Sequence, residues 1–235
     1  MTDRRAWPRS ADELIAVQLA LADEHPPPWE VPADPTTMSV AACFVCFERG
    51  SVGAGRAGER GWAAAVVIRG RQVIATATIA GAAGAPYEAG LLALREAPLL
   101  AAAVDALAHR PDVLMVDATG RDHPRRAGMA LHLGAVLDLP TVGVTNRTLV
   151  ARGEPPPDER LASSPLLLDG DEVGRWVRTR PRRHPVAVHA AWRTAPAVAA
   201  AVVATAVERF RTPEPLRLAR HHARQARHQR PDDEG

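Results

Sequence analysis

One segment constrains the fold of this chain more than any other: a short apolar run that ends in an aspartate and leads into a His-Pro-Arg-Arg turn. The run from Asp112 to Val116 has the composition of a buried central strand, and Asp117 follows it directly. Apolar residues then recur at helical spacing over residues 125–139, where Pro124 suits a helix start. Because open α/β sheets bind ligands at the carboxyl ends of their strands, Asp117 marks a candidate functional edge.

Length and charge indicate one α/β domain with a basic end. The 235 residues, 46% of them hydrophobic, suffice to bury one sizeable core. The net charge is only +2, yet residues 217–230 contain five arginines and three histidines. We therefore predict a domain over residues 1–217 and a basic tail over residues 218–235. The tail is either a solvated, frayed helix or a sequence-independent phosphate contact.

The cysteines and the hydropathy of the sequence indicate the cellular compartment that we expect. Cys43 and Cys46 are three residues apart on a predicted strand and point to opposite faces, so we interpret them as two buried small hydrophobic residues rather than a disulfide. The sequence has no signal-like start and no apolar run of the roughly 20 residues that span a bilayer. We expect a cytoplasmic monomer with no membrane partner.

Periodicity and turn residues predict the remaining elements. Helices are expected at residues 11–21, 91–107, 125–139 and 196–210, and strands at residues 38–47, 62–69, 72–80, 112–116, 141–145, 166–168, 173–177 and 186–190. Residues 26–35 are proline-rich and predicted extended, residues 50–61 are a glycine-rich loop, and Pro98 predicts a kink or a first-turn break. This order predicts an α/β mixed sheet with helices on both faces.

Several motifs in series then carry a resemblance. They are Pro86-Tyr87, Leu94-Arg95-Glu96, Val116-Asp117 with Gly120 and His123-Pro124-Arg125-Arg126, Pro140-Thr141-Val142-Gly143-Val144, and Pro213-Glu214-Pro215. In order and spacing they resemble the endonuclease V family, from about Leu14 to Arg217. The resemblance implies a ribonuclease H-like fold and a divalent metal, Mg²⁺ or Mn²⁺. It also implies cleavage of DNA or RNA near a deaminated adenine, inosine, one bond beyond the damaged base.

The resemblance assigns Glu96 and Asp117 as metal ligands and places His123 with them in the catalytic set. Phosphodiester hydrolysis uses metal ions held by carboxylates to polarise the phosphate and to lower the pKa of the attacking water. Each acid also has an ordinary alternative. Glu96 fits a solvated helical position beside Arg95, and Asp117 fits a helix cap.

The chain departs from the family at the residues that should complete this site. Phe44 stands where the family has an aspartate, Asn146 where it has a lysine, and Trp192 where it has a histidine. Phenylalanine cannot bind magnesium, and an amide cannot supply the charge of a lysine. Asp122 or His189 would have to replace the lost ligands in an active enzyme. The metal cofactor is therefore required only if activity persists.

The residues that the resemblance implies for substrate binding are better retained. Tyr87 matches a wedge residue that stacks in the gap left by a flipped nucleotide, although Glu88 and Ala89 replace its usual neighbours. The base-binding positions also include Ala118-Thr119 in place of Gly-His. The other predicted substrate-binding residues are Gly90, Leu91, Gly120, Arg125 and Arg126. The alternative for Tyr87 is a loop tyrosine that packs on the core. The alternative for Arg125 and Arg126 is that both are solvated surface side chains.

Three hypotheses follow, and the sequence leaves open whether the chain is an enzyme. The first is an inosine-recognising DNA- or RNA-binding protein of a repair-type family with weak or lost cleavage. The second is an active metal-dependent nuclease with a rearranged metal site. The third is a repurposed fold that no longer meets nucleic acid.

Overall fold

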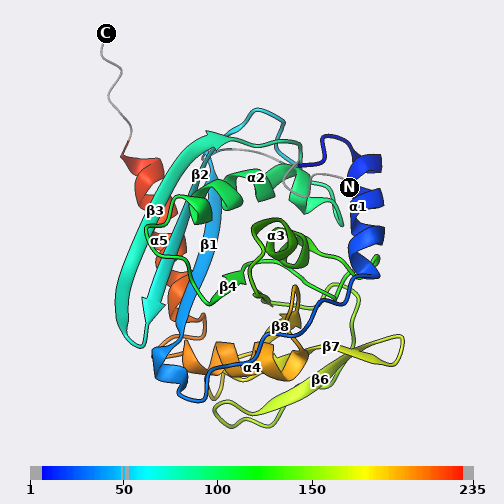
Figure 1. Ribbon diagram of the computed structural model, residues 1–235, viewed down its shortest axis with the longest axis vertical. Coiled ribbons are helices and arrows are strands. Elements are labelled where there is room, and N and C mark those ends of the chain that lie inside the picture. Colours follow the sequence, from blue (N-terminus) through cyan, green and yellow to red (C-terminus); the bar gives the residue numbers. More distant parts are fainter. Residues whose placement is uncertain (1–6, 49, 51–52, 230–235) are drawn as a thin grey trace.

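The computed structural model describes residues 7–48, 50 and 53–229, and these residues build one eight-stranded mixed sheet (Figure 1). The strands lie in the order β3-β2-β1-β4-β5-β8-β7-β6. Their bounds are β1 Ser39–Phe47, β2 Arg60–Arg69, β3 Gln72–Ala82, β4 Val113–Val116, β5 Thr141–Thr145, β6 Ser163–Leu168, β7 Asp171–Val177 and β8 Val186–Ala190. The neighbours β1, β4 and β5 pair in parallel, so their carboxyl ends meet at one edge.

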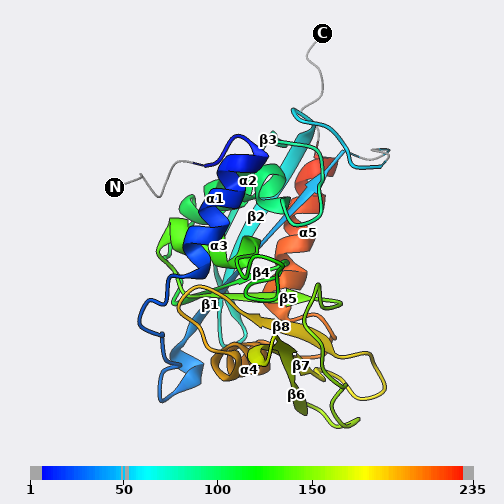
Figure 2. The ribbon, with the colours of Figure 1, turned by 90° about the vertical axis from the view of Figure 1, so that its right-hand side faces the viewer.

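Helices cover both faces of this sheet, as the sequence predicts. They are α1 Ala11–Ala22, α2 Leu92–Asp105, α3 Met129–Leu137, α4 Pro196–Thr205 and α5 Glu214–His228. One core joins α1, α2 and α3 to the sheet, and a second core joins α4 and α5 to the opposite face. Figure 2 shows α1 to α3 on one side of β1 and β2 and α5 on the other side. Alternation along β1 divides the cysteines between these faces, with Cys43 in the first core and Cys46 beneath α5.

Several predicted boundaries were wrong for local reasons. The short 3-10 helix η1, Pro35–Thr37, begins at the last residue of the segment predicted to stay extended, residues 26–35, and Asp34 caps it through its side chain. Helix α2 continues through Pro98, so the proline does not break its first turn. Helix α4 ends at Thr205, several residues before the predicted end at residue 210. The predicted loop over residues 50–61 ends where β2 begins at Arg60, and its residues 51 and 52 lie outside the described part of the chain.

Pro124 does not start a helix. Helix α3 begins at Met129 after Gly128, and residues 117–128 form an ordered loop, which we call the β4–α3 loop. Arg126 has φ +53°, in the left-handed region, so a helix could not pass through it. Gly128 closes the loop, because a Cβ there would lie 2.4 Å from the Thr119 carbonyl oxygen. The His-Pro-Arg-Arg turn is therefore separated from the helix N-terminus.

The basic segment near the C-terminus is a packed helix. Helix α5 buries Leu216, Ala219 and Ala223 against the sheet, and its own sequence crosses the predicted boundary between residues 217 and 218. Residues 218–228 thus belong to the folded domain, because apolar residues at helical spacing anchor them. Residues 230–235 of the predicted tail lie outside the described residues.

Candidate functional site

The two predicted metal-binding carboxylates do come together at the carboxyl end of β4. Asp117 follows the last residue of β4, and Glu96 lies on α2. Burial chiefly, and then the charge of Asp117, raise the pKa of Glu96 to about 7. Burial and the charges of the same two acids also raise the pKa of the Cys43 thiol on β1. Glu96, Asp117 and the buried Cys43 are therefore near enough for the two carboxylates to act on the pKa of their neighbours.

An arginine already neutralises Asp117. The Nη2 atom of Arg220 on α5 donates to Oδ2 of Asp117 at 2.7 Å. The same guanidinium lies over the ring of Phe44, with 5.5 Å between its carbon and the ring centroid. Phe44 occupies the position at which a third carboxylate is expected. The cation beside Asp117 is thus a side chain of the protein, stacked on an aromatic ring. We call Phe44, Glu96, Asp117 and Arg220 the carboxylate cluster.

The donor set of this cluster does not fit a catalytic divalent metal. It offers two carboxylates, where such sites usually share three, and Arg220 lies on one of their oxygens. Within the described ranges, no three His, Cys, Asp or Glu side chains form a group that could hold a metal ion. A thiol is a poor partner for Mg²⁺, so Cys43 does not repair the set.

Asn146 contacts an arginine from elsewhere in the chain. Its Oδ1 accepts a 2.6 Å hydrogen bond from Nη1 of Arg211, just ahead of α5. Burial chiefly, and then the nearby positive charge of Arg220, lower the pKa of Arg211. Positive charge is therefore present beside Asn146, although residue 146 itself is neutral. Trp192 is buried in the core shared with α3 and lies against Gly134.

Asp122 and His189 are not available as replacement ligands. The Asp122 carboxylate is fully buried and accepts backbone hydrogen bonds from Leu149, Val150 and Ala151. Nδ1 of His189 lies 3.4 Å from the same carboxylate, and Nε2 lies 2.8 Å from the Thr145 hydroxyl. Burial lowers the pKa of His189 to about 4, which keeps the ring neutral. The pair fixes the loop after β5.

A second cluster surrounds the carbonyl of Gly90. This oxygen accepts hydrogen bonds from Nε2 of Gln18 at 3.0 Å, from Nη2 of Arg125 at 2.9 Å and from Nε2 of His123 at 3.2 Å. Arg125 also donates through Nε to Oε1 of Gln18 at 2.6 Å. We call these four residues the Gly90 cluster. It joins α1, the loop before α2 and the β4–α3 loop.

His123 serves this cluster as a neutral ring. Its Nδ1 accepts from the Arg125 amide, and its Nε2 carries the proton donated to Gly90. Burial and the charge of Arg125 lower its pKa to about 4. Gly90 has φ +80°, a conformation that favours glycine. Gly90 and Arg125, predicted for substrate binding, and His123, predicted for catalysis, are thus hydrogen-bonded together in one loop junction.

The remaining predicted binding residues differ in exposure. Tyr87 is 51% exposed, and its backbone amide donates to the Ala54 carbonyl. Leu91 is buried, and Gly120 approaches β8 so closely that a Cβ would lie 2.1 Å from the Ala190 carbonyl oxygen. Arg126 pairs with Asp169 and Asp171 in the β6–β7 turn.

Sequence reasoning missed three residues that organise the site. Arg220 lies in the segment predicted to be a basic tail, and Gln18 lies in the helix predicted over residues 11–21. Arg211 carried no motif at all. The signal for Arg220 was present in its spacing from Leu216 and Ala223, which predicts that α5 packs against the sheet beneath it.

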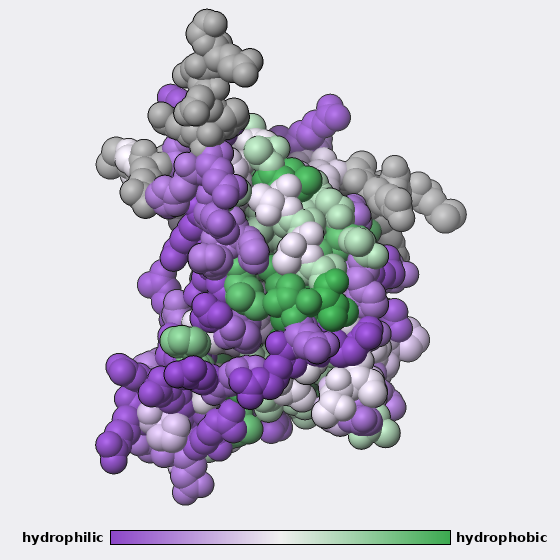
Figure 3. Space-filling view, turned by 90° about the vertical axis from the view of Figure 1, so that its left-hand side faces the viewer, coloured by the Kyte–Doolittle hydropathy of each residue, from purple (hydrophilic) through white to green (hydrophobic). Residues whose placement is uncertain are grey.

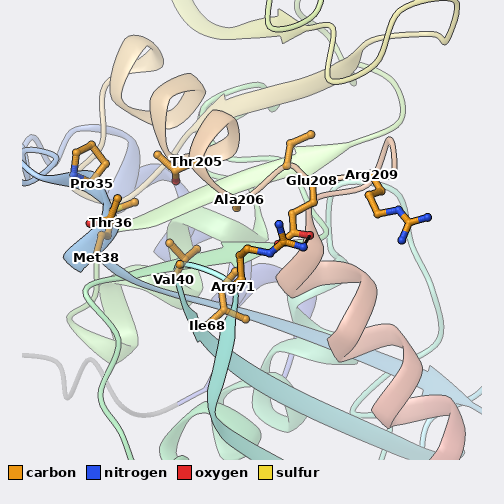
Figure 4. Close-up of a pocket in the computed structure, with 12 residues that line it drawn as sticks. Pro35, Thr36, Met38, Val40, Ile68, Arg71, Thr205, Ala206, Glu208 and Arg209 are labelled. Carbon is orange, nitrogen blue, oxygen red and sulfur yellow. Dashed lines mark ion pairs between the residues drawn. The ribbon is translucent and has the colours of Figure 1, made fainter.

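A cavity of about 600 Å³ lies apart from these residues, between η1, the β2–β3 turn and the end of α4 (Figure 4). Its lining includes Met38, Val40 and Ile68, and Arg71 pairs with Glu208 across it at 3.4 Å. It includes none of the predicted site residues. The described helices include none that combines the length and apolar character needed to cross a membrane.

Comparison with known proteins decides the family. The family model of Endonuclease V matches residues 35–221. The chain belongs to the endonuclease V family. An Endonuclease V of Roseiflexus sp. strain RS-1 is 45% identical over 134 residues, which cover 57% of this chain and 60% of the relative. The Endonuclease V of Streptomyces avermitilis is 37% identical over 222 residues, covering 91% of this chain and 90% of the relative.

Solved endonuclease V structures confirm the ribonuclease H-like fold. The crystal structure of the Streptomyces avermitilis protein superposes with a TM-score of 0.80 at 36% identity, covering 94% of both chains. The Ciona intestinalis Endonuclease V, solved in complex with DNA containing an inosine followed by a ribo-adenosine, has a TM-score of 0.71 at 21% identity. That match covers 92% of this chain and 96% of the other. The matched family region extends past residue 217 into α5, in agreement with its packing.

Proposed function

We propose that this endonuclease V family member binds DNA or RNA containing deaminated adenine and has lost efficient phosphodiester cleavage. The observation that carries the proposal is the contact of Arg220 with Asp117 above the ring of Phe44. A guanidinium compensates one carboxylate charge, yet it has no vacant coordination positions for water and phosphate. It therefore cannot supply the chemistry of a bound metal.

The Gly90 cluster supports the binding part of the proposal. Side-chain and backbone groups from three segments converge there, and the adjacent Tyr87 presents an exposed ring. An exposed aromatic next to a rigid loop suits a wedge that stacks in the gap of a flipped base. A relative of the same fold was solved with inosine-containing DNA, and this supports the same class of ligand here.

The proposed loss of cleavage is attributed to several departures from the residues expected in the family, and these departures act together. Removing one electrostatic group from an active site commonly slows a reaction by ~10²–10³, and cooperating groups are not additive. Here the residues at 44, 146 and 192 are all changed, and Asp117 is ion-paired. The alternative of an active nuclease is supported only by the proximity of Glu96 and Asp117.

The proposal is tested by binding and cleavage on one substrate. Purified protein is mixed with labelled DNA or RNA strands that contain inosine or adenine at one position, with Mg²⁺ or Mn²⁺ present. We expect tighter binding to the inosine strands and no nick above the level of Asp117→Ala. Equal binding to both strands would refute inosine recognition. An Asp117-dependent nick would establish the active nuclease instead.

A further inference from the structure

The outer face of α5 is a basic groove. The inner face buries Leu216, Ala219 and Ala223, and Glu214 in the first turn is the only acid of the helix. The residues that line the groove are Arg217, Arg220, His221, Arg224, Gln225 and His228. None of them is acidic. Figure 3 shows hydrophilic side chains in a column along α5, beside a hydrophobic surface to which the exposed Val73 and Ile74 of β3 contribute.

Aromatic rings lie beneath the guanidinium groups of this groove. Arg217 lies over the ring of Phe210 at 5.1 Å, and Arg224 joins Arg220 over Phe44 at 5.8 Å. Stacking on a ring restricts a planar guanidinium. Two of these groups are also held by acids, since Arg217 donates through Nε and Nη2 to Glu214 and Arg220 donates through Nη2 to Asp117. Ordered guanidinium groups lose less rotamer freedom when they bind an anion.

The positive surface continues beyond the helix to the carboxyl end of β5. Arg211 donates to Asn146, and the charge of Arg220 contributes to lowering the pKa of Arg211. A guanidinium group therefore lies beside Asn146 as well as beside Asp117. We call Arg211, Arg217, Arg220 and Arg224 the α5 arginines.

We infer that the α5 arginines bind the phosphodiester backbone of the nucleic acid and lead the strand from the end of β5 along α5. This inference rests on the proposed function and assigns its backbone path. Arg217 and Arg224 are seven residues apart, about 10 Å along a helix, so the row matches a repeating anion rather than one isolated ion. Planar guanidinium groups bind phosphate oxygens in bidentate geometry.

The position of this row of α5 arginines favours nucleic acid over an acidic peptide as the ligand. It ends at Asp117 and Asn146, at the carboxyl ends of β4 and β5, where ligands bind in sheets of this kind. Phe44 now supports arginines where a metal ligand is expected. The substitution thus exchanges a catalytic cation for cations that hold the backbone.

The test measures binding of labelled inosine and adenine strands by fluorescence anisotropy over a series of salt concentrations. The variants are Arg224→Gln and the double variant Arg217→Gln/Arg224→Gln, which keep good helix formers on α5. Arg69→Gln is the matched control, since Arg69 is an exposed arginine at the end of β2. Thermal melting checks that every variant is folded.

We expect Kd to rise roughly three- to tenfold for each α5 arginine removed, equally for both strands. The slope of log K against log salt should fall by about 0.7–0.9 for each arginine replaced, and Arg69→Gln should match the wild type. Unchanged Kd and slope in the double variant would overturn the inference while wild-type inosine binding upholds the proposed function. A loss confined to the inosine strand, or equal competition by polyglutamate, would also overturn it. Failure of the wild type to bind any strand would overturn both.

Discussion

The β4–α3 loop contributes residues to two regions, and these regions depart to very different extents from the residues that the family resemblance predicts. At its start, Asp117 belongs to the carboxylate cluster, where Phe44 and Arg220 replace the expected ligand and cation. Further along, His123 and Arg125 belong to the Gly90 cluster, where both side chains lie within hydrogen-bonding distance of the Gly90 carbonyl. One loop therefore supports both the carboxylate cluster, which lacks an expected ligand, and the junction at which we propose substrate binding.

Burial favours the neutral form of a titratable group in both regions, and it therefore shifts the pKa of a base and of an acid in opposite directions. Burial keeps the histidine ring of the Gly90 cluster neutral, with the pKa of His123 at about 4. In the carboxylate cluster burial instead favours the protonated acid, with the pKa of Glu96 at about 7. Cleavage depends on charge held at a few atoms, whereas binding depends on loop shape and stacking. Changes at three or four residues can thus remove the first and leave the second.

Gly120→Ala should have the largest effect, because Gly120 lies in the loop between the two regions. A Cβ there would lie 2.1 Å from a backbone oxygen of β8, so the loop must move. We expect a loss of about 3 kcal/mol in the free energy of unfolding, measured by urea denaturation. Gly70→Ala is the control, since Gly70 has φ +57° with nothing within 4 Å, and should cost only about 1 kcal/mol. Equal losses would contradict a close-packed loop.

Tyr87→Ala separates binding from stability. The ring is 51% exposed, so its removal should leave the melting temperature unchanged. Loss of base stacking should weaken binding of inosine strands by about 1–3 kcal/mol in anisotropy titrations. An unaltered affinity would show that Tyr87 is a surface residue without a wedge role.

Glu96→Gln tests the carboxylate cluster through pH. Because the folded pKa of about 7 exceeds the ordinary 4.5, the native state binds more protons than the unfolded state between these values. The contribution of Glu96 to stability therefore falls as pH rises through that window. We expect the variant to be more stable than the wild type at pH 8, by on the order of 1–2 kcal/mol.

Three buried histidines, which also titrate between folded and unfolded states, serve as the internal control for this prediction. His123, His132 and His189 have folded pKa values of about 4, below the ordinary 6.5, so their contribution is lost as pH falls through that range. Both proteins contain these histidines, and the difference between the two pH profiles isolates Glu96. Parallel profiles would refute a raised pKa.

Arg220→Gln should have the smallest effect on folding. The pair with Asp117 is partly exposed, at 25% and 28% of the side-chain surfaces, so its loss should cost less than about 1 kcal/mol in thermal melts. Adding Phe44→Asp to this variant offers three carboxylates, and we expect Mn²⁺ to raise its melting temperature but not that of the wild type. A Mn²⁺ response in the wild type would contradict the role assigned to Arg220.

The sequence predicted the parts of the molecule that depend on local patterns. Alternation and turn residues located the strands from β1 to β8, and the apolar run before Asp117 placed that residue at the carboxyl end of β4. The sequence did not predict long-range pairings, because no local pattern shows that Arg220 contacts Asp117, 103 residues away. The left-handed Arg126 likewise has no sequence signature, which is why the start of α3 was predicted too early.

Single-turnover cleavage of an inosine-containing strand tests the central claim most directly. Wild-type protein in excess over the strand is incubated with Mn²⁺, with Asp117→Ala run beside it as the background. The account predicts nicking by the wild type at the background rate, although anisotropy shows the strand to be bound. A wild-type nick one bond beyond the inosine that Asp117→Ala abolishes would contradict it.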